Sequence, residues 1–234
     1  MKKKKLENIK LPAPRPIIEL HESVPIHCRV LIVCEGKKTE PNYFQSFHMM
    51  QHGGIVFEIE TEGKGENTKQ VVQKAINLRD YAESIDKPFD SVWAVFDRDS
   101  FSDEKFNTAI QMAEQRGINT AWSNEAFELW YVLHFQYRNT PMSRNDYAQE
   151  ITFRVNEAGY PKRAYKYKKN AIDSQRVMSQ YGSDTDAIRN AERLHLSYTD
   201  NRHAQHNPCT TVYQLVRLLR GEDNEFNHKI IMNI

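Results

Sequence analysis

Three acidic residues are spaced so that their side chains could bind one metal ion. Glu35 directly follows a short apolar run at residues 28–34, and Asp97 and Asp99 follow another at residues 91–96. Such runs are typical of buried parallel strands, whose carboxyl ends meet at one edge of a sheet. Alternation along a strand, or an extended turn, lets Asp97 and Asp99 point the same way.

The chemistry of such a cluster is that of a hard divalent cation. Three carboxylates that converge without matched lysines repel one another, and oxygen ligands suit Mg²⁺ or Mn²⁺. An ion held there can activate water and stabilise the leaving oxygen in phosphodiester hydrolysis, with Glu35 as an additional general acid or base. An Asp-x-Asp sequence is also common in turns and helix caps, so the residues alone leave both interpretations open.

Two more glutamates are candidates for this site. Glu40 lies in the first turn of the helix expected after Glu35, where it could be a fourth ligand or only a favourable charge at a helix N-terminus. Glu128 lies in the segment 126–135, which is apolar almost all round and therefore predicted to be buried. A buried carboxylate needs a partner, so Glu128 either completes the metal shell or pairs with an arginine or histidine. We expect His134 to be a core histidine.

Two basic segments could hold phosphate groups. Lys37 and Lys38 follow Gly36 and precede a helix, as in a phosphate cradle, although the Walker pattern is missing. Residues 160–169 interleave three tyrosines with five basic residues, which suits phosphate contact and base stacking, although a solvated loop would look the same. The five basic residues are Lys162, Arg163, Lys166, Lys168 and Lys169.

A zinc site is a weaker candidate. His203, His206 and Cys209 are spaced by three residues, and His195 is the nearest fourth ligand. Asn207-Pro208 interrupts this spacing, and we do not expect zinc.

The elements that would position these residues alternate along the first half of the chain. Apolar patterns predict strands at 28–34, 55–60, 91–96 and 118–122. One helix is predicted after each strand: the first begins at Thr39, the second spans 68–84, the third begins near Ser102, and the fourth runs from 123 or 124 to 135. This order predicts an α/β fold with a mostly parallel sheet and helices on both faces. After residue 140 we expect no strand but helices near 143–157, 170–180, 184–199 and 209–220. We therefore divide the chain into a flexible basic arm (1–26), an α/β core (27–137) and a mainly helical C-terminal part (138–234) that packs on the core.

Composition excludes several classes of protein. The 234 residues include three cysteines, too few for a disulfide framework, and no apolar run long enough to cross a membrane. The lysines that follow Met1 have no apolar stretch behind them, so we expect no signal peptide and a cytoplasmic protein. The net charge of +1 argues against tight, indiscriminate binding of duplexes and favours a structured or partner-delivered substrate.

Three segments together resemble the RloB family. They are residues 31–44, 123–135 and 207–216, with Asp97-Arg98-Asp99 between the first two. That family is similar to Toprim-fold proteins, in which a glutamate after the first strand and a later Asp-x-Asp bind Mg²⁺. The resemblance thus implies a Toprim-like fold with Glu35, Asp97 and Asp99 as the metal ligands. Overcoming-lysogenization-defect nucleases place a further acid four residues after the glutamate, where this chain has Thr39, with Glu40 next to it.

The resemblance also implies a role. Members of the RloB family occur in restriction-modification loci and abortive-infection systems, often beside an ATPase, so we expect a bacterial phage-defence effector. The chain has no ATPase motif, so an ATPase would be a separate partner. We expect an Mg²⁺-dependent nuclease for DNA or RNA, tRNA included, that is latent without its partner. Two alternatives remain. The protein could be a module that docks the ATPase, or it could be a phosphoryl-transfer enzyme that acts on small nucleotides. The sequence also leaves open whether the protein forms a homodimer.

Overall fold

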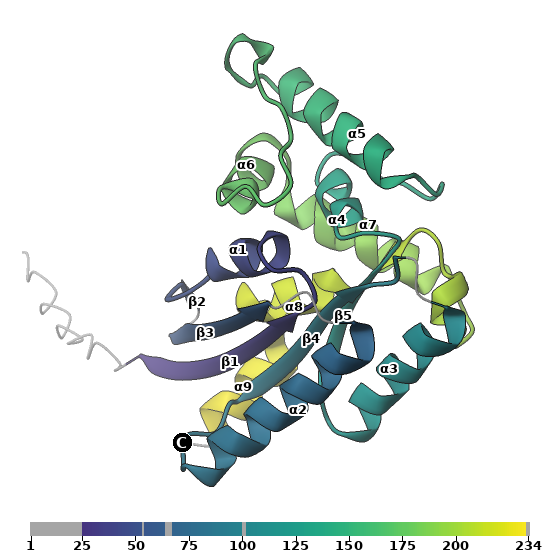
Figure 1. Cartoon of the computed structure of the whole chain (residues 1–234). Coiled ribbons are helices and arrows are strands. Elements are labelled where there is room, and N and C mark those ends of the chain that lie inside the picture. Colours follow the sequence, from purple (N-terminus) through teal and green to yellow (C-terminus); the bar gives the residue numbers. More distant parts are fainter. Residues whose placement is uncertain (1–24, 53, 64–66, 100–101, 233–234) are drawn as a thin grey trace, which may run out of the picture.

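The computed structural model describes residues 25–52, 54–63, 67–99 and 102–232 (Figure 1). The predicted basic arm lies outside the described residues up to residue 24, and its last residue, Ile26, already begins the first strand. In the described part of the chain, no helix is long and apolar enough to cross a membrane.

The centre of the molecule is a six-stranded sheet with the order β2-β3-β1-β4-β5-β6. The four inner strands, β3, β1, β4 and β5, are parallel to one another, whereas β2 and β6 pair antiparallel with β3 and β5 at the two edges. This arrangement confirms the predicted α/β fold with a mostly parallel sheet. The strands are β1 (Ile26–Cys34), β2 (Gln51–His52), β3 (Ile55–Gly63), β4 (Ser91–Asp97), β5 (Asn119–Asn124) and β6 (Cys209–Thr210).

The helices follow the predicted order with two differences. The helix expected from residue 123 or 124 begins only at Glu128, and a final helix after residue 220 was not predicted. They are α1 (Thr39–Gln45), α2 (Thr68–Ser84), α3 (Asp103–Gln115), α4 (Glu128–Leu133), α5 (Arg144–Glu157), α6 (Ser174–Tyr181), α7 (Asp184–Leu196), α8 (Val212–Leu219) and α9 (Asn224–Met232), with 3₁₀ turns at Pro161–Arg163 and His203–Gln205.

Local signals explain where several helices begin and end. The side chain of Asn67 accepts a hydrogen bond from the N–H of Gln70 and forms a capping box at the start of α2. Ser102 caps α3 through the N–H of Lys105. Gly117, with φ +66, follows the end of α3, a backbone conformation that glycine adopts readily.

The two faces of the sheet bury separate groups of side chains. Along β1, Val30 and Ile32 face the core under α1, α4 and α8, whereas Leu31 and Val33 face the core under α2 and α3. Figure 1 shows α2 and α3 side by side over one face of the sheet, with α5, α6 and α7 beyond its carboxyl edge.

The expectation that the C-terminal part contains no strand is wrong. Ser123 and Asn124 of β5 pair with Thr210 and Cys209, so the C-terminal part supplies β6 of the sheet. Two residues are too few to show an alternating pattern in the sequence. The helices α7 and α8 that flank β6 pack on each other and, through α4 and β5, on the core.

Candidate metal site

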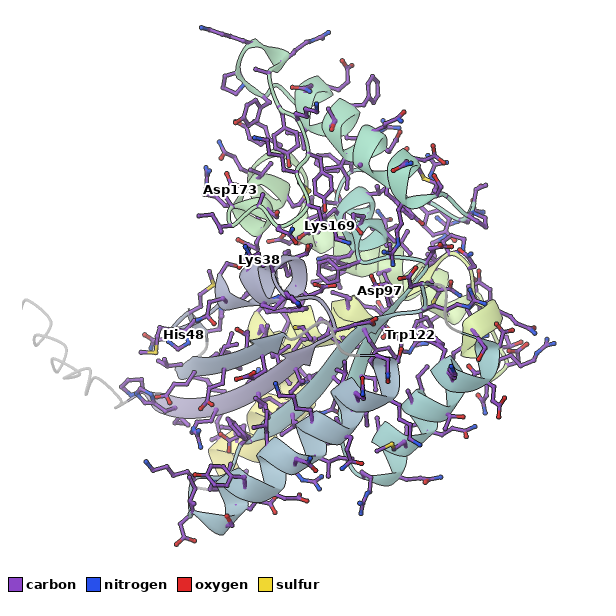
Figure 2. The ribbon with its side chains drawn as sticks, in the orientation of Figure 1. Lys38, His48, Asp97, Trp122, Lys169 and Asp173 are labelled. Atoms are coloured by element: carbon purple, nitrogen blue, oxygen red, sulfur yellow. The ribbon has the colours of Figure 1, made fainter. Side chains whose placement is uncertain are left out.

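Glu35 and Asp97 meet at the carboxyl edge of the sheet because β1 and β4 are neighbouring parallel strands. The N–H of Asp97 donates a hydrogen bond to Glu35 Oε2 at 3.1 Å. The N–H of Glu35 in turn donates to the carbonyl of Val95 at 2.9 Å. Figure 2 shows Asp97 at the end of β4, beside the junction with the C-terminal helices.

Asp99 joins this pair through a tight turn after β4. Its φ is +44, and its N–H donates to the carbonyl of Glu125 at 3.3 Å. One guanidinium nitrogen, Nη2 of Arg144, lies 3.8 Å from Asp97 Oδ2 and 3.3 Å from Asp99 Oδ2. Because one cation contacts both carboxylates, the two aspartates point to the same side, as the sequence predicted.

Sequence reasoning did not place Arg144 at this site. It is the first residue of α5, in the C-terminal part, and Ser143 caps that helix. Nothing in the sequence distinguishes this arginine from others at helix ends, because only the packing of α5 brings it to the carboxylates.

Glu40 lies in the same cluster rather than at an exposed helix end. The side chain is buried, and its Oε2 atom has no hydrogen-bond partner among the residues that the structure describes. Its carboxylate folds back over the backbone of Gly36, where an added Cβ would lie only 1.9 Å from Glu40 Oε2. Only glycine leaves that space, so Gly36 allows Glu40 to turn toward the edge of β1.

Glu128 adds a fifth carboxylate, and its partner is neither arginine nor histidine. The buried Tyr167 hydroxyl donates to Glu128 Oε1 at 2.9 Å. Tyr167 is therefore not available to stack on a base, contrary to one part of the sequence interpretation. His134 is buried, as expected for a core histidine.

The carboxylates disturb one another's ionisation. The pKa of Glu35 is raised to about 7, chiefly by burial. The hydrogen bond from the N–H of Asp97 lowers this pKa, whereas the negative charges of Glu40 and Asp99 raise it further. Burial likewise raises the pKa of Asp97 and of Glu40, and the negative charge of Glu128 adds to both effects. Arg144 opposes all three shifts, and Lys169 opposes that of Glu40. The ionised form of each carboxyl group is therefore disfavoured at this edge, where the carboxyl groups outnumber the cations that oppose the shifts.

Replacing Tyr167 by phenylalanine is expected to destabilise the fold by about 1–2 kcal/mol, because a buried Glu128 carboxylate would lose its hydrogen bond. Urea unfolding measures this change. Tyr165→Phe is the matched control, since Tyr165 is only half-buried. Equal unfolding free energies for the two variants would contradict this role for the Tyr167–Glu128 pair.

The predicted basic residues divide into a near and a far group. The near group lies around α1. Lys38 directly precedes α1. Asn170, which follows Lys169, lies against the start of α1, because its Oδ1 atom accepts a hydrogen bond from Thr39 Oγ1 at 3.0 Å. Figure 2 shows Lys38 and Lys169 on the side of the sheet that holds Asp97, and Lys37 is exposed next to Lys38. Lys166 and Lys168 are exposed on the segment that leads to Lys169.

Lys162 and Arg163 lie far from the carboxylates. They belong to the 3₁₀ turn after α5, and Arg163 forms an exposed ion pair with Glu157 at 3.4 Å. Arg144 starts the 14-residue helix α5, and at 1.5 Å per residue its far end is about 20 Å away. A basic run that is continuous in sequence is therefore not one patch around the site.

The three histidines considered for zinc surround an aromatic side chain. The rings of His195, His203 and His206 lie 6.1, 5.5 and 6.5 Å from that of Trp122. His206 Nε2 contacts Asp200 at 2.9 Å, and burial raises the pKa of Cys209 to about 12. A thiol with so high a pKa is a poor source of thiolate for a metal.

The donor chemistry of the carboxylate cluster fits a hard divalent cation. The oxygens are hard ligands, one buried oxygen of Glu40 has no partner, and negative charge exceeds the nearby positive charge. As the side chains stand, no three Asp, Glu, His or Cys residues in the described part of the chain form a metal-binding group. Arg144 contacts the carboxylates of Asp97 and Asp99 instead. Binding an ion would therefore require the carboxylate side chains to move closer together around it.

A protein-family model describes this combination of fold and motifs. The model of the RloB-like protein family matches residues 30–219. The chain belongs to the RloB-like family. All the candidate residues, from Glu35 to Lys169, lie within the region that matches the RloB-like model. Comparison with curated proteins and with solved structures gives no match.

Proposed function

We propose that this RloB-like protein is a metal-dependent nuclease. The observation that carries the proposal is the convergence of Glu35, Asp97 and Asp99 at the carboxyl edge of a parallel sheet, with Glu40 and Glu128 behind them. Ligand sites of open α/β sheets lie at this edge. Membership in the RloB-like family supports an effector role in bacterial phage defence, because members of that family occur in restriction-modification loci and abortive-infection systems.

The residues would divide the work as follows. Glu35, Asp97 and Asp99 would hold Mg²⁺ or Mn²⁺, with the unpartnered oxygen of Glu40 as an additional ligand. The ion would supply an activated water and charge neutralisation at the scissile phosphate. Lys37, Lys38 and Lys169 would hold the strand beside it, since phosphate contacts by lysine position a nucleic acid. Arg144 would neutralise the aspartates in the metal-free protein.

Calorimetry with Mn²⁺ and cleavage assays test this proposal together. We expect the purified protein to bind Mn²⁺ and, because it is expected to be latent without its partner, to cut one of three pools, plasmid, single-stranded DNA or total tRNA, only slowly, with cleavage lost in EDTA. The pool that is cut identifies the substrate class. A protein that binds no Mn²⁺ at millimolar concentration would contradict the proposal.

A further inference from the structure

Arg144 stands where the carboxylate cluster needs a cation. Its Nη2 atom lies 3.3 Å from Asp99 Oδ2 and 3.8 Å from Asp97 Oδ2, so it contacts two of the three proposed metal ligands. Arg144 is the first residue of α5, which lies beyond the carboxyl edge of the sheet in Figure 1. The positive charge beside these aspartates therefore comes from the C-terminal part of the chain and not from the sheet.

The contacts of Arg144 with the aspartates are loose. Both distances exceed the roughly 2.7–2.9 Å of a charge-assisted hydrogen bond, whereas Arg217 donates two hydrogen bonds to Glu192 at 2.7 and 2.8 Å. The buried Nε atom of Arg144 has no hydrogen-bond partner among the residues that the structure describes. Charge rather than a fixed set of hydrogen bonds thus holds this guanidinium, and such a contact can be exchanged for another.

Arg144 and a divalent cation would compete for the same oxygens. A guanidinium this close to the aspartates would repel an ion bound between them, because like charges at such short range interact strongly. An ion would also draw the carboxylates toward itself, since as they stand no three acidic, histidine or cysteine side chains among the described residues form a metal-binding group. Occupation of the site by metal therefore favours a displaced Arg144.

A displaced Arg144 can bind a phosphate group. Its side chain is 36% exposed, so solvent reaches it from the side away from the aspartates. Arginine binds phosphate through two parallel hydrogen bonds, a geometry that lysine does not offer. In the proposed function, on which this step rests, the scissile phosphate lies against the metal and hence beside the displaced guanidinium.

We propose that Arg144 is a switch that couples metal binding to nucleic-acid binding. Without metal it pairs with Asp97 and Asp99 and weakens the affinity of the site for a divalent cation. With metal bound it leaves the aspartates and binds a phosphate of the nucleic-acid backbone. Metal and nucleic acid then strengthen each other's binding, because both favour the displaced position of Arg144.

Calorimetry with Mn²⁺ tests the competition without any cleavage. We expect Arg144→Gln to bind Mn²⁺ about tenfold more tightly than the wild type, because no guanidinium competes for the aspartates. Arg144→Lys keeps the positive charge and should bind Mn²⁺ more weakly than Arg144→Gln. Arg189→Gln is the matched control, since Arg189 forms an exposed ion pair with Asp186 on α7, and it should bind Mn²⁺ like the wild type.

Binding of labelled nucleic acid tests the coupling. The probes are fluorescein-labelled total tRNA and a labelled 20-nucleotide DNA strand, titrated in EDTA and in Ca²⁺, a cation that takes the same oxygen ligands. In Ca²⁺ we expect Arg144→Gln to raise the Kd of the probe that binds by about tenfold, because a bidentate phosphate contact is lost. In EDTA the substitution should change Kd by less than about twofold, because Arg144 is then paired with the aspartates. A purely structural role of Arg144 would instead weaken the binding of both metal and nucleic acid.

The outcomes separate the switch from the proposed function. Equal and measurable Mn²⁺ affinities of the wild type and Arg144→Gln would overturn the switch and leave the metal site standing. No Mn²⁺ binding by either protein would contradict the proposed function and the switch together. An effect of Arg144→Gln on nucleic-acid binding that is the same in Ca²⁺ and in EDTA would also overturn the switch, as would no binding of either probe by the wild type in Ca²⁺.

Discussion

Replacing Asp97 by asparagine is expected to lower metal-dependent cleavage by about 10²–10³-fold and, at the same time, to stabilise the metal-free protein. The loss of cleavage follows because Asp97 lies at the centre of the proposed ligand set, next to Glu35 and Asp99. The gain in stability follows because Asp97 carries a charge that its surroundings disfavour. These two changes have opposite signs, which distinguishes a binding residue from a structural one.

The physical reason is the number of negative charges around Asp97. Burial raises the pKa of Asp97 most, and Glu40, Glu128 and Glu35 raise it further, whereas Arg144 is the cation that lowers it. Asparagine keeps the shape and removes the charge, so the remaining carboxylates repel one another less. We expect an increase in unfolding free energy of about 0.5–2 kcal/mol, as is common when functional-site strain is removed.

Urea unfolding in EDTA and cleavage in Mn²⁺ measure the two effects on the same preparation. Asp80→Asn is the matched control, because Asp80 is exposed on α2 and forms an ion pair with its neighbour Arg79. The control should keep both the cleavage rate and the stability of the wild type. A loss of stability in Asp97→Asn, or full cleavage, would show that Asp97 serves the fold rather than a metal.

Much of the site was predictable because it depends on the parallel sheet. Buried strands appear in the sequence as short apolar runs, and the residue that follows each run is then placed at the carboxyl edge. This logic predicts that Glu35 lies beside Asp97, and the hydrogen bond between them confirms that placement. The helix over 68–84 was predicted at its observed bounds, since α2 combines a clear apolar spacing with a capping residue at Asn67.

The residues that sequence reasoning missed come from long-range packing. Arg144 and Tyr167 reach the carboxylates from the C-terminal part. Arg144 has no distinctive pattern around it, and the pattern around Tyr167 predicted contact with nucleic acid rather than with Glu128. The basic segment 160–169 shows the converse, because neighbours in sequence separate when the chain turns at Pro161–Arg163 and returns toward α1. Edge strands as short as β2 and β6 carry no period, so hydrogen bonding alone defines them.

The substitution Asp184→Asn is expected to cause the largest loss of stability, about 3 kcal/mol at neutral pH, because Asp184 joins three elements behind the site. Its carboxylate accepts from Ser179 Oγ of α6 at 2.8 Å and from Arg220 Nη1, after α8, at 2.9 Å. It also lies 3.3 Å from Nε2 of His134, whose side chain is fully buried at the end of α4. Removing the charge would leave Arg220 without its buried partner.

The pH dependence of stability identifies the same carboxylate. Burial acts to raise the pKa of Asp184, but its contacts with His134, Ser179 and Arg220 outweigh burial and hold that pKa below its usual range. The folded state then binds this proton less readily than the unfolded state, where the pKa is about 3.9. The stabilisation is therefore complete above pH 4 and is lost as pH falls through the folded pKa.

Urea unfolding of wild type and Asp184→Asn between pH 7 and pH 3 measures this contribution. The difference in unfolding free energy should be largest at pH 7 and should shrink below about pH 4, because the wild-type carboxylate becomes protonated. Asp186→Asn is the matched control, since Asp186 lies two residues further along α7 in an exposed ion pair with Arg189, and it should cost less than about 1 kcal/mol. If the difference in unfolding free energy between the wild type and Asp184→Asn did not change with pH, the loss of stability would be due to packing rather than to the charge of Asp184. Because His134 directly follows α4 (Glu128–Leu133), the same network fixes the helix that carries one of the site's carboxylates.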